Sequence, residues 1–117
     1  MRRNQNVIDE EVTFSDDEEL VSVTDTRGVI RYANSEFCRV AGFSKEELTG
    51  KNHNIVRHPD MPKAAFADMW SKLQSGQAWR GAVKHRCKDG RSYWVDAFVT
   101  PLSESDKLAG FQSVRTT

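Results

Sequence analysis

The order in which hydrophobic periodicity changes along the chain constrains its fold more than any other feature. Period-two alternation predicts five strands, at residues 20–25, 29–33, 79–87, 92–102 and 108–116. Helical signals fill the long interval between the second and the third strand. Two strands, a block of helices and three strands are typical of an α+β fold. In such a fold one antiparallel sheet carries its helices on a single face, and a small-molecule pocket can form between the two layers.

The helical interval contains clear start and stop signals. Asn34 is expected to cap a first short helix that ends at Gly42. Ser44 and Glu47 match a capping box, which predicts a second short helix. Pro62 is expected to start the longest helix, because a missing N–H costs nothing at that position. The apolar face of this helix follows helical spacing at Phe66, Met69, Trp70 and Leu73.

Composition and charge narrow the possible functions. The chain has 117 residues, and the charges of its 17 basic and 17 acidic residues cancel. It therefore lacks the excess of basic residues that is typical of nucleic-acid-binding proteins. Its hydrophobic runs are short, so we expect no membrane insertion by this segment and no signal peptide. Two isolated cysteines, Cys38 and Cys87, suit buried thiols in a reducing, cytoplasmic compartment. The polar residues 1–19 are interpreted as an N-terminal cap, and residues 20–117 as one domain.

Strand parity indicates which side chains face the expected pocket. Trp79, Val83 and His85 share the apolar side of their strand and should point inward. In the next strand Trp94 and Phe98 should lie on the outer face, where exposed aromatic side chains suggest a partner. Alternation does not fix the orientation of the last strand, which contains Arg115.

The segment NIVRHPDMP, residues 54–62, places three ionisable side chains ahead of the longest helix. Arg57 can donate bidentate hydrogen bonds to a phosphate or hold a ring carbonyl, and His58 can make a similar contact. Asp60 is anionic and therefore a poor phosphate ligand. It is expected either to orient Arg57 or His58, or to cap the helix behind Pro62.

The sequences YANSEFCRVAGFSKEELTGKNHNIVRHPDMP, KDG and YWVDAFVTPL resemble the PAS sensor domain over nearly the whole chain. The block NIVRHPDMPKAAFADMW is similar to the FAD-binding PAS sensors of bacterial aerotaxis receptors. This resemblance implies a five-stranded antiparallel PAS sheet, with a flavin ring between sheet and helices. It also implies that Arg57, His58 and Asp60 match positions associated with FAD binding.

Further residues are assigned by the same resemblance. Trp79 matches an aromatic position near the flavin, and Arg115 matches a position that contacts the ring edge in light-sensing LOV domains. Trp70 replaces the arginine that LOV domains place on the flavin phosphate, which suggests stacking on adenine. His53 stands where LOV photosensors carry their reactive cysteine, so no cysteinyl adduct can form there.

Two more positions complete the set of candidate cofactor-binding residues. His85 stands where these relatives tend to have asparagine; a single histidine tautomer offers its donor and its acceptor on different ring atoms. Asn34 is a further candidate, although capping is its commoner role.

The resemblance implies a non-enzymatic sensor of redox state or oxygen in an aerotaxis or energy-taxis receptor. Its expected partners are the flavin nucleotide, the HAMP and signalling regions of the same receptor, and a second copy in a homodimer. The expected location is the cytoplasmic side of a membrane-anchored receptor. Two alternatives remain open, a haem-binding gas sensor and a cofactor-free dimerisation module. A haem would need His53, His58 or His85 as its axial ligand. A hydrolase is disfavoured because neither a serine elbow nor a spaced carboxylate pair is present.

Overall fold

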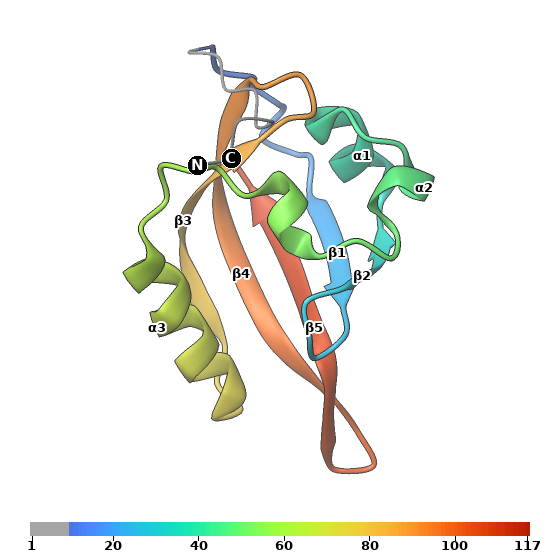
Figure 1. Ribbon diagram of the computed structural model, residues 1–117, viewed down its shortest axis with the longest axis vertical. Helices are drawn as coiled ribbons and strands as arrows, with labels where there is room; N and C mark the ends of the chain where they lie inside the picture. The colour runs from blue at the N-terminus through green and yellow to red at the C-terminus, as the bar shows by residue number, and fades with distance from the viewer. Residues whose placement is uncertain (1–9) are drawn as a thin grey trace.

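The computed structural model describes residues 10–117 and contains one five-stranded antiparallel sheet (Figure 1). The strands lie in the order β2-β1-β5-β4-β3, so the last strand of the chain occupies the centre of the sheet. Their bounds are Leu20–Thr24 for β1, Ile30–Ala33 for β2, Trp79–Arg86 for β3, Ser92–Glu104 for β4 and Lys107–Thr116 for β5. The predicted α+β class, sheet and strand count are confirmed.

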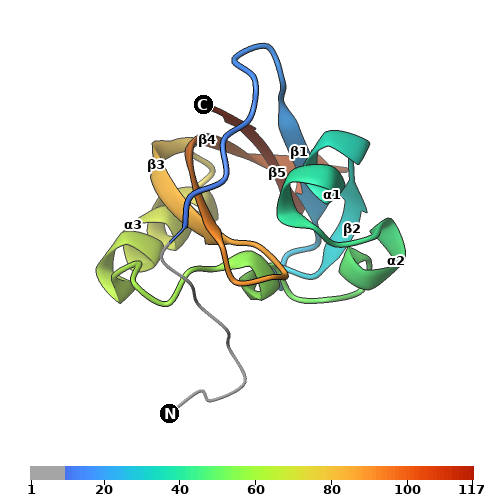
Figure 2. The same cartoon turned by 90° about the horizontal axis from the view of Figure 1, so that it is seen from above.

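The helices between β2 and β3 gather on one face of the sheet (Figures 1 and 2). They are α1 (Ser35–Ala41), α2 (Lys45–Leu48), the 3-10 helix η1 (His53–Val56) and α3 (Lys63–Gln74). α3 lies against β3 and β4, whereas α1 lies against β1. No helix within residues 10–117 is both long enough and apolar enough to cross a membrane.

The predicted helix caps are present. The Asn34 side chain accepts a hydrogen bond from the Phe37 backbone at the start of α1, and Ser44 and Glu47 form the capping box of α2. α3 begins directly after Pro62 without any side-chain cap, so Asp60 does not cap this helix. The sequence analysis did not predict the 3-10 helix η1. Asn52 is its N-cap, and the Asn52 side chain accepts a hydrogen bond from the Asn54 backbone N–H.

Strand parity is confirmed on both sides of the sheet. Val83, His85, Val95 and Ala97 are buried on the inner face, while Trp94 and Phe98 are exposed. The structure also resolves the orientation of β5. Its inner face carries Phe111, Ser113 and Arg115, all of them buried.

Part of the predicted N-terminal cap docks on β4. Residues 10–12 run beside Ser92, with hydrogen bonds from Val12 N–H to the Ser92 carbonyl and from Ser92 N–H to the Glu10 carbonyl. Phe14 then packs edge-on against Tyr93. Residues 1–9 of this predicted cap lie outside the described residues. Both cysteines are free thiols, but only Cys87 is buried, because Cys38 is partly exposed.

Candidate functional site

A cavity of about 430 Å³ lies between the inner face of the sheet, η1 and α3. The sheet supplies the floor through residues of β1, β3, β4 and β5, and α3 supplies an apolar wall. The β1–β2 turn and η1 complete the rim. The lining residues are Ser22, Thr24, Arg27, Gly28, Asn52, His53, Asn54, Arg57, Phe66, Met69, Trp70, Leu73, Trp79, Val83, His85, Ala97, Val99, Phe111, Ser113 and Arg115.

Six of the nine predicted site residues line this cavity: His53, Arg57, Trp70, Trp79, His85 and Arg115. They come from five different elements or loops, and the fold brings them to one space. Asn34, His58 and Asp60 are not among the lining residues.

Arg115 contributes a buried cation to the floor of the cavity. Its side chain is 1% exposed, and it donates hydrogen bonds to the Leu20 carbonyl at 3.2 Å and to Ser22 Oγ at 2.8 Å. The guanidinium also lies over the Phe37 ring, 4.7 Å from its centroid. Burial lowers the pKa of Arg115 to about 10, so the group stays charged at neutral pH.

His53 lies beside this guanidinium. Its Nε2 is 2.5 Å from Arg115 Nη2. A guanidinium can only donate, so Nε2 is the acceptor and the ring proton sits on Nδ1. Burial, followed by the positive charge of Arg115, lowers the pKa of His53 well below its ordinary value. His53 is therefore a neutral ring at physiological pH.

His85 is a second neutral imidazole on the floor. Its Nδ1 lies 3.0 Å from the Val56 carbonyl, which can only accept, so Nδ1 carries the proton and Nε2 offers a lone pair. Burial and then the charge of Arg115 lower the pKa of His85 to about 3. Behind it, Tyr93 stacks at a tilt with ring centroids 5.4 Å apart, and its buried hydroxyl has no hydrogen-bond partner among the described residues.

Large apolar side chains form the walls. Trp70 packs edge-on against Phe111, with ring centroids 5.1 Å apart. Trp79 is fixed by a 3.1 Å hydrogen bond from its Nε1 to Asp68 on α3. Such flat, mostly apolar surfaces suit a planar ring.

Arg57 lies where η1 ends and meets β3. Its guanidinium is stacked on the Phe66 ring at 4.2 Å from the centroid, and its backbone forms an isolated bridge with His85. The predicted cation is thus held at the cavity by an aromatic ring of α3. Asp60 does not orient it through any hydrogen bond or ion pair recorded for residues 10–117.

His58 and Asp60 form a separate turn outside the cavity. His58 is buried, and its Nδ1 accepts a 3.0 Å hydrogen bond from the Asp60 backbone N–H. The Asp60 carboxylate is exposed and lies 3.7 Å from the same Nδ1 and 3.8 Å from Lys84 Nζ. This geometry agrees with the prediction that Asp60 orients His58, in the turn that precedes α3.

Asn34 is fully engaged elsewhere. Its Oδ1 accepts from the Val21 and Phe37 backbones, and its Nδ2 donates to the Glu19 carbonyl at 2.9 Å. The side chain joins β1 to α1. Its capping role is therefore present, whereas a direct contact with a ligand in the cavity is not supported by this position.

Several lining residues were missed by the sequence interpretation. Ser22 and Ser113 belong to the floor, and Arg27, Asn52 and Asn54 belong to the rim. The inward parity of Ser22 was readable from β1. Arg27 lies within the predicted turn of residues 26–28 and gave no sign of facing a site.

The charge of the lining is one-sided. It includes three arginines, Arg27, Arg57 and Arg115, and no aspartate or glutamate from the described chain. Such a cavity attracts electron-rich or anionic ligands. Across residues 10–117 no cluster of three or more metal-ligating side chains occurs.

Comparison with known proteins places this site in context. The PAS fold family matches residues 30–115. The aerotaxis receptor of Escherichia coli K12 is 46% identical over 116 residues, which is 99% of this chain but 23% of the receptor. The chain therefore spans about a quarter of that relative's length.

Two examples illustrate the solved structures that share the fold. A PAS domain from Colwellia psychrerythraea superposes with a TM-score of 0.76 at 23% identity, covering 83% of either chain. The light-state structure of the blue-light photoreceptor Aureochrome1 LOV also reaches a TM-score of 0.76, at 20% identity, covering 84% of this chain and 80% of that one.

Proposed function

The chain belongs to the PAS fold family, and on that premise we propose that it is a FAD-binding sensory domain of an aerotaxis or energy-taxis receptor. It would sense redox state or oxygen through reduction of the flavin and signal by a change of conformation rather than by catalysis. The observation that carries this proposal is the cavity, which combines apolar aromatic walls with arginines and lacks acidic lining residues in the described chain.

The residues present fit the ring of a flavin. At about 430 Å³ the cavity lies in the lower half of the range of small-molecule pockets. That volume suits a planar ring system between the aromatic walls, and the longer nucleotide tail would leave through the rim. FAD would supply reversible reduction of its ring at this position.

The polar floor gives each of its residues a distinct role. The His85 lone pair at Nε2 is available to accept a hydrogen bond from the edge of the ring. Arg115 supplies a fixed positive charge that favours added negative charge nearby. At an effective dielectric of about 20, a unit charge about 4 Å away contributes about 4 kcal/mol. Arg115 and His53 are hydrogen-bonded to each other, so a new partner for one would change the contacts of the other.

The outer face of the sheet supplies the proposed output surface. Trp94 is 49% and Phe98 46% exposed on β4, opposite the face that lines the cavity. Exposed aromatics of this kind suit docking to another domain. The proposed partners are the HAMP and signalling regions of the same receptor, in a homodimer on the cytoplasmic side of the membrane.

A visible absorption spectrum of the purified protein tests the cofactor. Flavin bands that bleach on addition of dithionite are the expected result. A Soret band would contradict the proposal and indicate a haem sensor. A colourless protein that binds no added FAD would indicate a cofactor-free module.

A further inference from the structure

We propose that Arg27, on the β1–β2 turn, binds a phosphate of the flavin nucleotide tail. The proposal rests on the proposed function, because it assumes that a flavin ring occupies the cavity. It adds a ligand-binding residue and a specificity, namely for phosphorylated over unphosphorylated flavins.

The cavity opens to solvent at the β1–β2 turn and at residues 52–54. Within the described chain three of the lining residues are exposed, Arg27, Asn52 and Asn54, while the others are buried or half-buried. All three are polar, and they belong to two segments that are bonded together. Asn52 Nδ2 donates to the Arg27 carbonyl at 3.3 Å, and His53 N–H donates to the Gly28 carbonyl at 2.8 Å. A polar tail that cannot fit inside would leave the cavity here.

Arg27 gives the cavity mouth a positive charge. Arg27 is the charged member of this exposed group, and its side chain is 76% exposed. A guanidinium at a polar mouth can bind a phosphate bidentately. The neighbouring amides of Asn52 and Asn54 can donate further hydrogen bonds but add no charge.

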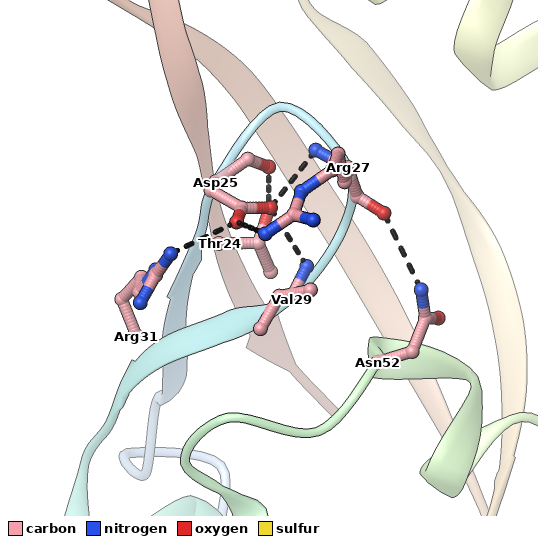
Figure 3. A network of polar contacts seen from close by, with 6 residues as sticks. All are labelled: Thr24, Asp25, Arg27, Val29, Arg31 and Asn52. Carbon is pink, nitrogen blue, oxygen red and sulfur yellow. Dashed lines mark hydrogen bonds and ion pairs between the residues drawn. The ribbon is translucent and has the colours of Figure 1, made fainter.

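Asp25 fixes the backbone of the turn that carries Arg27 (Figure 3). The Asp25 Oδ1 accepts hydrogen bonds from the backbone N–H groups of Arg27 and Val29, at 2.8 and 3.0 Å. The other oxygen, Oδ2, contacts two guanidinium groups, Arg27 at 3.3 Å and Arg31 at 3.1 Å. The backbone of the turn is therefore fixed independently of the Arg27 side chain.

This arrangement leaves Arg27 free to change partners at little cost. If its guanidinium turned to a phosphate, Asp25 would keep both backbone hydrogen bonds and the ion pair with Arg31. The Arg27–Asp25 pair is also solvent-exposed, and such pairs stabilise a protein only weakly.

Arg27 and the floor cation Arg115 lie at opposite ends of β1. Arg115 pairs with Leu20 at one end of β1, and Arg27 follows Thr24 at the other end. The length of β1 separates these levels by about 13 Å. Two cationic poles at opposite ends of the site match a ligand with an electron-rich ring at one end and phosphates at the other.

The test compares FAD and FMN with riboflavin, which has the same ring but no phosphate; FMN carries a phosphate without the adenosine of FAD. Flavin-free protein is titrated with each ligand, and binding is followed by the change in flavin fluorescence. Arg27→Gln should weaken FAD binding about tenfold or more, as expected for a lost charge-assisted hydrogen bond, and leave riboflavin affinity unchanged. Arg31→Gln is the matched control, because it removes the same charge and the other partner of Asp25 but does not line the cavity.

The outcomes separate this proposal from the proposed function. If the wild type binds FAD and Arg27→Gln binds it equally well, or if Arg31→Gln weakens it as much, Arg27 is not a phosphate ligand although the sensor proposal stands. Equal losses for FAD and riboflavin would also overturn the phosphate contact, since they indicate a disturbed cavity. A wild type that binds neither flavin overturns both proposals. Partial recovery of FAD affinity in Arg27→Lys would support the role of charge.

Discussion

At the residue scale, the buried arginine of β5 is the clearest mark of a binding site. Arg115 is 1% exposed and, within residues 10–117, makes no ion pair with a carboxylate. Its charge is stabilised by hydrogen bonds and by the Phe37 ring alone. An arginine so placed makes the cavity selective for electron-rich ligands before any ligand arrives.

Replacing Arg57 tests the cation at the end of η1. Arg57→Ala should give folded protein that retains little flavin after purification, because the cavity loses the guanidinium cation that is stacked on the Phe66 ring. Flavin occupancy is measured from the ratio of visible to ultraviolet absorbance, and folding by circular dichroism. Arg80→Ala removes an equal charge from the exposed Arg80–Asp96 pair and should keep the flavin. Full flavin occupancy in the Arg57→Ala variant would show that Arg57 is not required for flavin binding.

His85 should give the folded protein a specific sensitivity to acid. Its folded pKa is about 3 against an ordinary value of 6.5, so between these pH values the unfolded state binds a proton that the folded state excludes. Stability is therefore complete above about pH 6.5 and falls by about 1.4 kcal/mol per pH unit below it for this group. His53 acts in the same direction.

His85→Asn should make that pH dependence less steep. Urea denaturation of flavin-free protein between about pH 6.5 and pH 4.5 measures the slope, and this window lies above the range in which Asp25 titrates, since its pKa is lowered to about 2. The variant should still bind flavin, with a shifted reduction potential. Identical slopes in both proteins would contradict a neutral buried His85.

At the element scale, the contact between the β1–β2 turn and β5 depends on a glycine. A Cβ at Gly110 would lie 2.1 Å from the Thr24 carbonyl oxygen, a backbone atom that cannot turn away. Gly110→Ala should therefore cost about 3 kcal/mol or more, because the turn and strand must separate. Gly50→Ala is the control, since its added Cβ would meet nothing within 4 Å and would carry only the strain of a positive φ, about 1 kcal/mol.

Thermal or urea unfolding measures both variants. We also expect Gly110→Ala to weaken FAD binding, since the displaced turn carries Arg27. Equal stability losses in the two glycine variants would show that the turn accommodates a methyl group.

Most elements were predictable because local chemistry determined them. The capping residues Asn34 and Ser44 and the alternation of β3 and β4 each gave the correct local structure. η1 was missed because one turn of 3-10 helix has too few residues for a periodic signal.

The site was only partly predictable, for a reason particular to binding sites. The inner face of β5 mixes Phe111 with Ser113 and Arg115, so alternation of apolar and polar residues could not orient the strand. Arg27 joins the cavity only through the packing of a turn against residues 52–54. Conversely, the family resemblance grouped His58 and Asp60 with Arg57, but these two residues are hydrogen-bonded to each other and are not among the residues that line the cavity.

At the scale of the whole molecule, ligand binding should be visible as stability. The cavity lies between the sheet and α3, so an occupant would bridge elements that unfolding separates. At 100 times its dissociation constant, FAD should raise the free energy of unfolding by about 2.7 kcal/mol and the melting temperature by on the order of 10 °C. Differential scanning calorimetry with and without FAD measures this. An unchanged melting temperature would indicate a cofactor-free module.

The outer sheet face should matter for signalling but not for folding. Substituting serine for both Trp94 and Phe98 should change stability little and leave flavin occupancy intact, because both side chains are exposed. In a receptor that carries this domain, the response to oxygen should be lost. Leu108→Ser, an exposed apolar residue near the β4–β5 hairpin, is the matched control. A full response to oxygen in the double variant would show that Trp94 and Phe98 do not form the output surface.

The floor and the mouth of the cavity are made by different parts of the chain. Sheet residues hold the deep end, whereas Arg27, Asn52 and Asn54 lie outside the strands. Substitutions at the mouth can therefore accumulate over evolution, or be introduced by design, without repacking the interior. For the flavin proposed above, tail preference and ring chemistry would be two separately adjustable properties, so one scaffold could exchange its nucleotide while keeping its electronic response.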